Sequence, residues 1–136
     1  MSWRIPPGWS QTGSSGLRFA TIKPSTGGGP DVSITQLKGD AGGLLANINR
    51  WRKEVGLGPI AQDDLSEHWK EFAAGDISGT LVEIVGSGSN PLRSTIVRLP
   101  FKGDTWFFKM IGPASEIEKH RDAYVEFVNS VRLGDP

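Results

Sequence analysis

The sequence TWFFKMI at residues 105–111 decides the fold of this 136-residue chain. Successive side chains of a β-strand point to opposite faces, so Trp106, Phe108 and Met110 share one face and Phe107 lies on the other. Both faces are apolar, which predicts a central strand that is covered on both sides. The sequence therefore predicts an α+β fold in which an antiparallel β-sheet is sandwiched between helices.

The segments around this strand supply the rest of the sheet and its helical cover. The predicted strands do not alternate one by one with helices, which favours antiparallel over parallel pairing. No internal repeat and no long linker divides the chain, so we expect a single domain over 1–136. Period-two and helical spacing predict strands at 17–23, 31–37, 72–74, 79–85 and 94–101, and helices at 43–55, from 63 or 64 to about 70, and from 115 onward.

Both long helices have an apolar stripe at helical spacing. In the first helix the stripe consists of Leu44, Ile48, Trp51 and Val55, and in the last of Ile117, Tyr124, Phe127, Val128 and Val131. Asp40 is predicted to cap the first helix. Ser115 and Glu118 have the spacing of a capping box at the start of the last helix. The first and last helices are therefore the predicted covers of the sheet.

Composition excludes several classes of protein. The chain has 15 basic and 15 acidic residues, and this balance argues against a nucleic-acid binder, which needs a basic surface. It has no cysteine, so disulfides and thiolate sites are excluded. No apolar run reaches the ~18 residues of a membrane span. Residues 1–9 lack the basic and apolar regions of a signal peptide.

The search for catalytic or metal-binding motifs finds little. The nucleophile elbow, the zinc-protease histidine pair and the phosphate-binding loop are all missing. His68 and His120 lie on separate predicted helices, and we expect His120 to be a hydrogen-bonded residue at the edge of the last helix. The alternative hypothesis is a small hydrolase or transferase that uses His120 with a nearby carboxylate such as Asp104. We expect no cofactor and no metal.

The densest group of polar and aromatic residues is on the first helix. Tryptophan and arginine often anchor interfaces, so the candidate binding surface comprises Asn47, Asn49, Arg50, Arg52 and Trp69, with Trp9 as an alternative to Trp69. A structural role for the same residues remains open as an alternative to binding. Arg52 falls at the edge of the apolar stripe and can pack its stem there, and Asn47 can hydrogen-bond loop backbone.

The chain resembles an uncharacterised family of bacterial proteins that are often exported or lipid-anchored. The resemblance covers most of the chain and rests on the Pro6–Trp9 opening, the GGLLANINRWR segment at 42–52 and the TWFFK segment at 105–109. The order of elements is also similar to the fold shared by the PsbP subunit of photosystem II and the Ran-binding import factor Mog. This resemblance implies an antiparallel sheet between helices and a role as a binding or assembly factor without a cofactor.

These observations lead to one functional hypothesis. We expect a non-catalytic accessory module that binds an unknown protein or small ligand, and the resemblance implies a place in the cell envelope. No partner-contacting motif of the PsbP or Mog proteins is present, so neither a photosystem nor a GTPase partner is carried over. We expect no nucleic-acid partner and no direct membrane span, and a monomer or weak homodimer.

Overall fold

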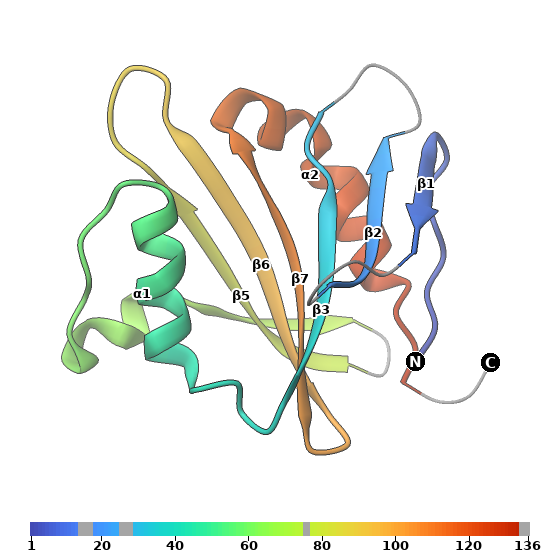
Figure 1. Ribbon diagram of the computed structural model, residues 1–136, viewed down its shortest axis with the longest axis horizontal. Helices are drawn as coiled ribbons and strands as arrows, with labels where there is room; N and C mark the ends of the chain where they lie inside the picture. The colour runs from blue at the N-terminus through green and yellow to red at the C-terminus, as the bar shows by residue number, and fades with distance from the viewer. Residues whose placement is uncertain (14–17, 25–28, 75–76, 134–136) are drawn as a thin grey trace.

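The computed structural model describes residues 1–13, 18–24, 29–74 and 77–133. Figure 1 shows a single twisted sheet with helix α1 on the side toward the viewer and helix α2 behind it. The elements in chain order are β1 (Trp9–Thr12), β2 (Arg18–Pro24), β3 (Val32–Lys38), α1 (Leu44–Glu54), the 3₁₀ helix η1 (Gln62–Glu67), β4 (Lys70–Ala74), β5 (Ile77–Val85), β6 (Leu92–Phe101), β7 (Asp104–Pro113) and α2 (Ala114–Asn129).

The seven strands form one sheet in the order β1-β2-β3-β7-β6-β5-β4. Every neighbouring pair is antiparallel. Strand β7 is the middle strand, paired with β3 on one side and β6 on the other. The predicted fold class is therefore confirmed, and the stretch at 105–111 occupies the central position that its two apolar faces require.

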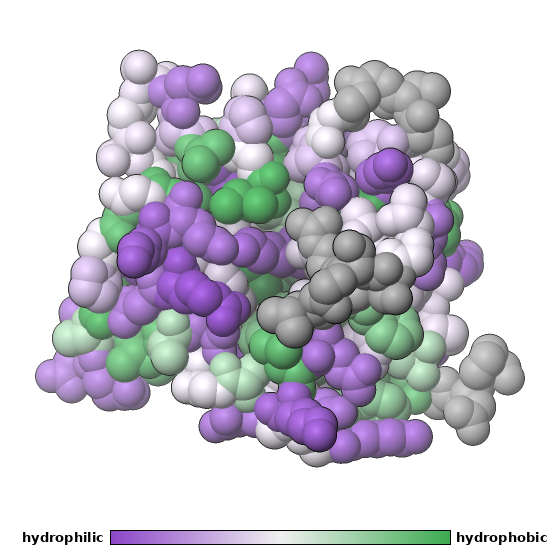
Figure 2. Space-filling model, in the orientation of Figure 1, coloured by the Kyte–Doolittle hydropathy of each residue, from purple (hydrophilic) through white to green (hydrophobic). Residues whose placement is uncertain are grey.

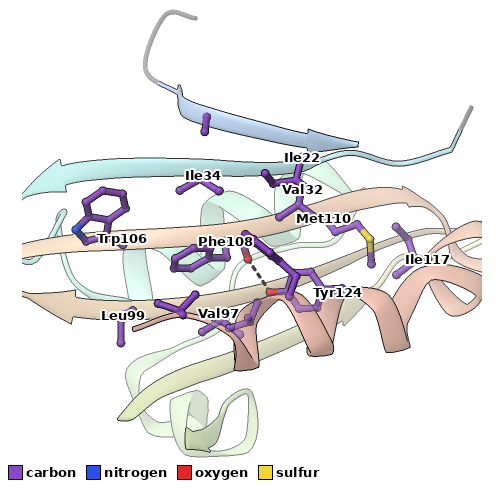
Figure 3. Close-up of a cluster of buried hydrophobic side chains, with 14 residues drawn as sticks. Ile22, Val32, Ile34, Val97, Leu99, Trp106, Phe108, Met110, Ile117 and Tyr124 are labelled. Carbon is purple, nitrogen blue, oxygen red and sulfur yellow. Dashed lines mark hydrogen bonds between the residues drawn. The ribbon is translucent and has the colours of Figure 1, made fainter. Parts of the chain in front are cut away.

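The larger hydrophobic core lies between the sheet and α2. Trp106, Phe108 and Met110 of β7 are buried there, as the alternation predicts. Figure 3 shows Tyr124 of α2 reaching across this core, where its hydroxyl donates a hydrogen bond of 2.7 Å to the backbone carbonyl of Phe108. The predicted stripe of the last helix is buried, since all five residues belong to this cluster, but α2 ends at Asn129 and Val131 lies just beyond it.

The second core lies on the opposite face, under α1. Ile48 and Trp51 of α1, and Val55 directly after it, pack on Phe107 of β7 together with apolar residues of β5 and β6. The Trp51 and Phe107 rings meet edge to face, with centroids 5.3 Å apart. This arrangement confirms that consecutive residues of β7 serve two separate cores, and it places the helical layers on both sides of the sheet.

Both predicted helix caps are wrong. Gly43, not Asp40, precedes α1, and Asp40 instead accepts a hydrogen bond of 3.1 Å from the amide of Gly42. Ser115 and Glu118 form no capping box, because β7 runs through Pro113 directly into α2. The first helical amide, that of Ala114, donates to the carbonyl of Pro91 instead, at 3.0 Å. A tertiary contact thus replaces the local one.

The sequence pattern predicts no strand before residue 17, but the structure has the short strand β1 there. Its residues Trp9–Thr12 pair with β2 along the outer edge of the sheet. Only Trp9 in this strand is apolar, so the strand has no alternating pattern that a sequence can reveal. None of the described helices has both the length and the apolar character needed to cross a membrane.

Candidate functional site

A pocket of about 260 Å³ lies at the start of the edge strand β4. We call it the Trp69 pocket, and it is lined by Glu67, His68, Trp69, Lys70, Leu81 and Glu83. Its volume is close to the lower limit of pockets that hold small ligands, about 300 Å³. It suits a single side chain of a partner or a small molecule.

The sheet brings two sides of this pocket together. Lys70 of β4 stands directly opposite Leu81 of β5 in the register. Glu83 follows Leu81 by two residues and therefore lies on the same face, the face that α2 covers further along the sheet. Trp69 precedes β4 and keeps 36% of its surface exposed. An exposed indole thus lies beside polar groups at the edge of the sheet.

Glu83 is held by two arginines. Arg121 of α2 donates to Glu83 Oε1 at 2.6 Å, and Arg93 of β6 forms an ion pair with Glu83 Oε2. Arg93 also pairs with Glu118 of α2. Burial raises the pKa of Glu83, but the hydrogen bonds and charges of Arg121 and Arg93 outweigh it and lower the pKa below its ordinary value. This carboxylate is therefore ionised and fixed in the wall of the pocket.

Side chains of α1 hold the segment that leads to Trp69. Asn49 accepts a hydrogen bond of 2.8 Å from the amide of Ile60, and its own amide donates to the Ile60 carbonyl at 3.2 Å. Arg52 donates from Nε to the carbonyl of Gly58 at 2.7 Å. Leu65 of η1 then packs against the core under α1. These contacts fix the chain just before it reaches the pocket.

The two remaining candidates on α1 have different surroundings. Asn47 is buried, with 2% of its surface exposed. Its amide donates to the carbonyls of Ala41 and Gly43, at 3.0 and 2.6 Å. Arg50 is exposed and lies over the Trp51 ring, with its guanidinium carbon 5.8 Å from the centroid. Figure 2 shows the outer surface around α1 as mostly hydrophilic.

Of the five candidate residues, only Trp69 lines the pocket. The other four share helix α1, and two of them contact the loop that precedes η1. Sequence reasoning missed the other five lining residues, Glu67, His68, Lys70, Leu81 and Glu83. The register of β4 on β5 brings the two strands of this pocket together. In the sequence, the one sign of a site here is the acidic residue within the apolar strand LVEIV at 81–85.

The structure separates the proposed catalytic pair. The His120 ring packs edge-on against Trp9, with centroids 5.5 Å apart, and lies beside Gly29. Gly112 lies against the adjacent Pro30, whereas Asp104 begins β7 at its other end. At 3.3 Å per residue, these two ends are about 25 Å apart. The combination of His120 with Asp104 is therefore wrong.

The Trp69 pocket offers charged side chains and an aromatic wall. His68 is among its lining residues, together with the carboxylates of Glu67 and Glu83. The six lining residues include no hydroxyl or thiol that could act as a nucleophile. In the described ranges, no three histidine or acidic side chains gather in a way that could hold a metal ion. The predicted hydrogen bond of His120 is likewise replaced, within these ranges, by its ring contact with Trp9.

Comparison with known proteins relates the chain to several solved structures. No protein-family model and no curated protein matches the sequence. A protein from Bacteroides thetaiotaomicron has a TM-score of 0.60 at 10% identity over 98% of this chain, which spans 44% of that protein's length. LpqN of Mycobacterium tuberculosis, involved in cell envelope biogenesis, has a TM-score of 0.51 at 14% identity over 90% of this chain and 76% of its own.

The third similar structure is the cyanobacterial PsbP, CyanoP, from Synechocystis sp. PCC 6803. It has a TM-score of 0.54 at 10% identity over 95% of this chain and 84% of its own. Identities this low relate the folds and carry no residue role from one protein to another. The seven-stranded antiparallel sheet with a helix on each face is the PsbP-like fold.

Proposed function

We propose that this chain is a non-catalytic binding module that captures a partner protein at the Trp69 pocket. The observation that supports this proposal is an indole with 36% of its surface exposed in the wall of a pocket. Tryptophan is enriched among the residues that dominate binding energy, because it buries a large rigid surface at small entropic cost. The proposal makes Trp69 the anchor of the interface.

The chemistry of the pocket indicates what it accepts. Trp69 and Leu81 offer apolar surface, while Glu67 and Lys70 place opposite charges around it. A partner side chain with an apolar body and a polar end fits this combination. The pocket adjoins β4, which is an edge strand with backbone groups available for an extended segment. We therefore favour an extended segment of a partner protein over a small molecule.

Helix α1 has a supporting role in this proposal. Asn49 and Arg52 are positioning residues, because they hold the loop that leads to η1 and Trp69. Arg50 is the exposed member of the group and contacts the partner at the margin of the interface. Asn47 holds the turn before α1 and acts only through the position of that helix.

We also propose that the module works in the cell envelope. LpqN, which is similar in fold, is described as involved in cell envelope biogenesis, and the resemblance of the sequence to exported bacterial proteins points the same way. Fractionation of the source cells tests this part alone. Recovery of the protein with the envelope is expected, and recovery only with the cytosol contradicts it.

Comparative affinity capture tests the binding function. The chain and its Trp69→Ala variant are immobilised, incubated with native lysate of the source cells, and the retained proteins are quantified by mass spectrometry. We expect at least one protein to be retained about tenfold less by the variant, since loss of an anchor costs more than ~1.4 kcal/mol.

The control is Leu92→Ala. Leu92 is an apolar residue exposed to a similar degree, 40%, that lies away from the pocket on β6. This variant should retain the same proteins as the unmodified chain. Identical capture profiles for the chain and Trp69→Ala would contradict the proposal, as would an equal loss in the two variants.

A further inference from the structure

A second pocket lies where β6 turns into β7. Its volume is about 350 Å³, within the range of small-molecule sites. It has aromatic walls and a polar margin, formed by Phe19, Phe101, Trp106, Gln36, Lys102 and Asp104. None of these residues lines the Trp69 pocket, so this is a separate site, and it does not depend on the proposed function.

The pocket exists because α2 is shorter than the strand it covers. Helix α2 has 16 residues and is about 24 Å long at 1.5 Å per residue, whereas β7 has 10 residues and is about 33 Å long at 3.3 Å per residue. Figure 3 shows Trp106 at the end of the core away from Ile117, beyond the last coils of α2. Met1 of the N-terminal segment also lines this pocket, and Trp3 contacts Phe19 at its wall.

A β-bulge places an aromatic side chain at this site. In the register of β2 on β3, Arg18 pairs with Thr35 and Ala20 pairs with Ile34, so Phe19 has no partner. As a result, Phe19 and Ala20 both face the core under α2, where regular alternation would send them to opposite faces. Bulges commonly redirect a side chain next to a functional site.

Phe19 is held in place and yet remains open to solvent. Its ring contacts Trp106 edge to face, with centroids 5.0 Å apart, and Trp3 at 6.2 Å. Even so, 48% of its surface is exposed. A fixed aromatic ring with one free side offers a ligand ring a surface that needs no reorganisation.

Two opposite charges flank the aromatic walls. The carboxylate of Asp104 accepts a hydrogen bond of 2.9 Å from the amide of Gln36. Lys102 lies over the Phe101 ring, with its ammonium 5.2 Å from the centroid. Within the described ranges, neither Lys102 nor Asp104 belongs to an ion pair. Both charges are therefore available to a ligand.

The backbone adds a separate indication for Lys102. It has a positive φ of 52°, followed by Gly103 at 81°, so the two form the kind of two-residue turn that favours Asn-Gly. A lysine is a costly choice at the first of these positions. Strained positions of this kind cluster at binding sites, and here the turn places a lysine in the lining of an aromatic pocket.

We propose that this second pocket binds a free aromatic α-amino acid. The ring of the ligand packs against Phe19 and Trp106, its carboxylate pairs with Lys102, and its ammonium pairs with Asp104. A ligand with only one of the two charges leaves the other protein charge without a partner. The size of the pocket matches a molecule of this class, since small-ligand sites begin at about 300 Å³.

Isothermal titration calorimetry with the full chain tests the proposal, with L-phenylalanine as the probe. We expect saturable 1:1 binding. 2-Phenylethylamine lacks the carboxylate and 3-phenylpropionate lacks the ammonium, and each should bind about tenfold more weakly, as expected for one lost hydrogen bond between charged groups. Glycine, which lacks the ring, should give no measurable heat.

Three variants place the binding in this pocket. Lys102→Asn keeps a residue that suits the turn and removes the charge, Asp104→Asn removes the other charge, and Phe19→Ala removes an exposed ring. Each should weaken the binding of L-phenylalanine about tenfold. Trp69→Ala, in the other pocket, should leave it unchanged. Circular dichroism of each variant checks that the fold is kept.

Nuclear magnetic resonance provides a second readout that does not depend on the variants. On titration with L-phenylalanine, the indole N–H signal of Trp106 should shift and that of Trp69 should not. The proposal is overturned if L-phenylalanine does not bind up to its solubility limit. It is also overturned if 3-phenylpropionate binds as tightly as the amino acid, or if the Trp69 signal is the one that shifts.

Discussion

Helix α2 and helix α1 cover opposite faces of one sheet, but they are attached to it in different ways. Helix α2 is joined to the strands by polar contacts as well as apolar ones. Tyr124 bonds the backbone of β7, and Arg121 and Glu118 are linked to Glu83 and Arg93 of β5 and β6. The polar bonds of α1 run mainly to its own neighbouring loops, apart from the ion pair of Glu54 with Lys109.

This difference separates the helix that is tied directly to the sheet, α2, from the helix that holds the segment leading to Trp69, α1. The core under α2 contains the larger set of buried residues in the described chain. The core under α1 is smaller and includes Leu65 of η1, close to the pocket. We therefore expect mutations in the core under α2 to affect global stability most, and mutations in the loop contacts of α1 to affect the position of Trp69.

The largest expected effect comes from two neighbouring residues of β7. Phe108→Ala should lower the free energy of unfolding by about 3–5 kcal/mol, since Phe108 is fully buried under α2. Phe107→Ala should cost less, about 2–3 kcal/mol, because α1 can move into the space left on its face. Urea denaturation of both variants measures the difference.

Hydrogen exchange sharpens this first comparison. In Phe107→Ala, amides of α1 should lose protection while amides of α2 keep theirs. In Phe108→Ala, protection should fall throughout the sheet and in both helices. An equal loss of stability in the two variants, together with identical exchange patterns, would show that the two faces unfold as one unit.

The second expected effect concerns the ion pairs that attach α2. Glu83→Gln should lower stability at neutral pH by about 1–3 kcal/mol, because Arg93 and Arg121 lose the charge that both contact. The pKa of Glu83 is lowered from 4.5 in the folded chain. Its contribution is therefore fully present above that pH and is lost as the pH falls through the lower, folded value.

Chemical denaturation at a series of pH values checks the direction of this pH dependence. The stability difference between the chain and Glu83→Gln should be constant above about pH 5 and shrink below it. Glu116→Gln is the matched control, because the ion pair of Glu116 in the described residues is an exposed one with Lys119 within α2, at 3.7 Å. This control should change stability by less than about 0.5 kcal/mol at any pH.

Much of the fold could be predicted because the decisive signals are local. The two faces of β7 and the stripes of α1 and α2 follow from spacing alone, and each is confirmed. The errors arise where a distant partner decides. Glu118 was predicted to cap α2, but Arg93 of β6 forms an ion pair with it. Spacing along the chain contains no information about that strand.

The candidate site was harder to predict for the same reason. Trp69 could be named from its type, since it falls on no apolar stripe. Lys70 and Leu81 meet only through the register of β4 on β5. Asn49 and Arg52 were named as contact residues, but their hydrogen bonds to a nearby loop could not be seen from the helical pattern. Polar side chains on a helix look the same whether they bind a partner or a loop.

The third expected effect lies on the α1 face and concerns the position of Trp69. Asn49→Ala removes two hydrogen bonds to Ile60 and should cost about 1–2 kcal/mol. Arg52→Ala removes one bond, to the exposed Gly58, and should cost about 0.5–1.5 kcal/mol. Both should weaken capture of the partner less than Trp69→Ala does.

Hydrogen exchange of the Ile60 amide distinguishes a positioning role from a contact. Asn49→Asp keeps the acceptor for this amide and should preserve its protection, whereas Asn49→Ala should abolish it. If partner capture follows the protection of Ile60 across these variants, Asn49 acts through the loop. If Asn49→Asp loses capture while Ile60 stays protected, Asn49 contacts the partner directly and its positioning role is refuted.

Arg50→Ala has the smallest expected effect on stability and is the most specific test of the α1 surface. Arg50 is exposed, and its one described contact is with the Trp51 ring. An exposed contact of this kind contributes about 0.5–1 kcal/mol, so the melting temperature should change little while partner capture weakens. Lys53→Ala is the control, since Lys53 is an exposed cation on the same helix. Unfolding of Arg50→Ala would make this arginine structural, and equal capture by the two variants would remove α1 from the interface.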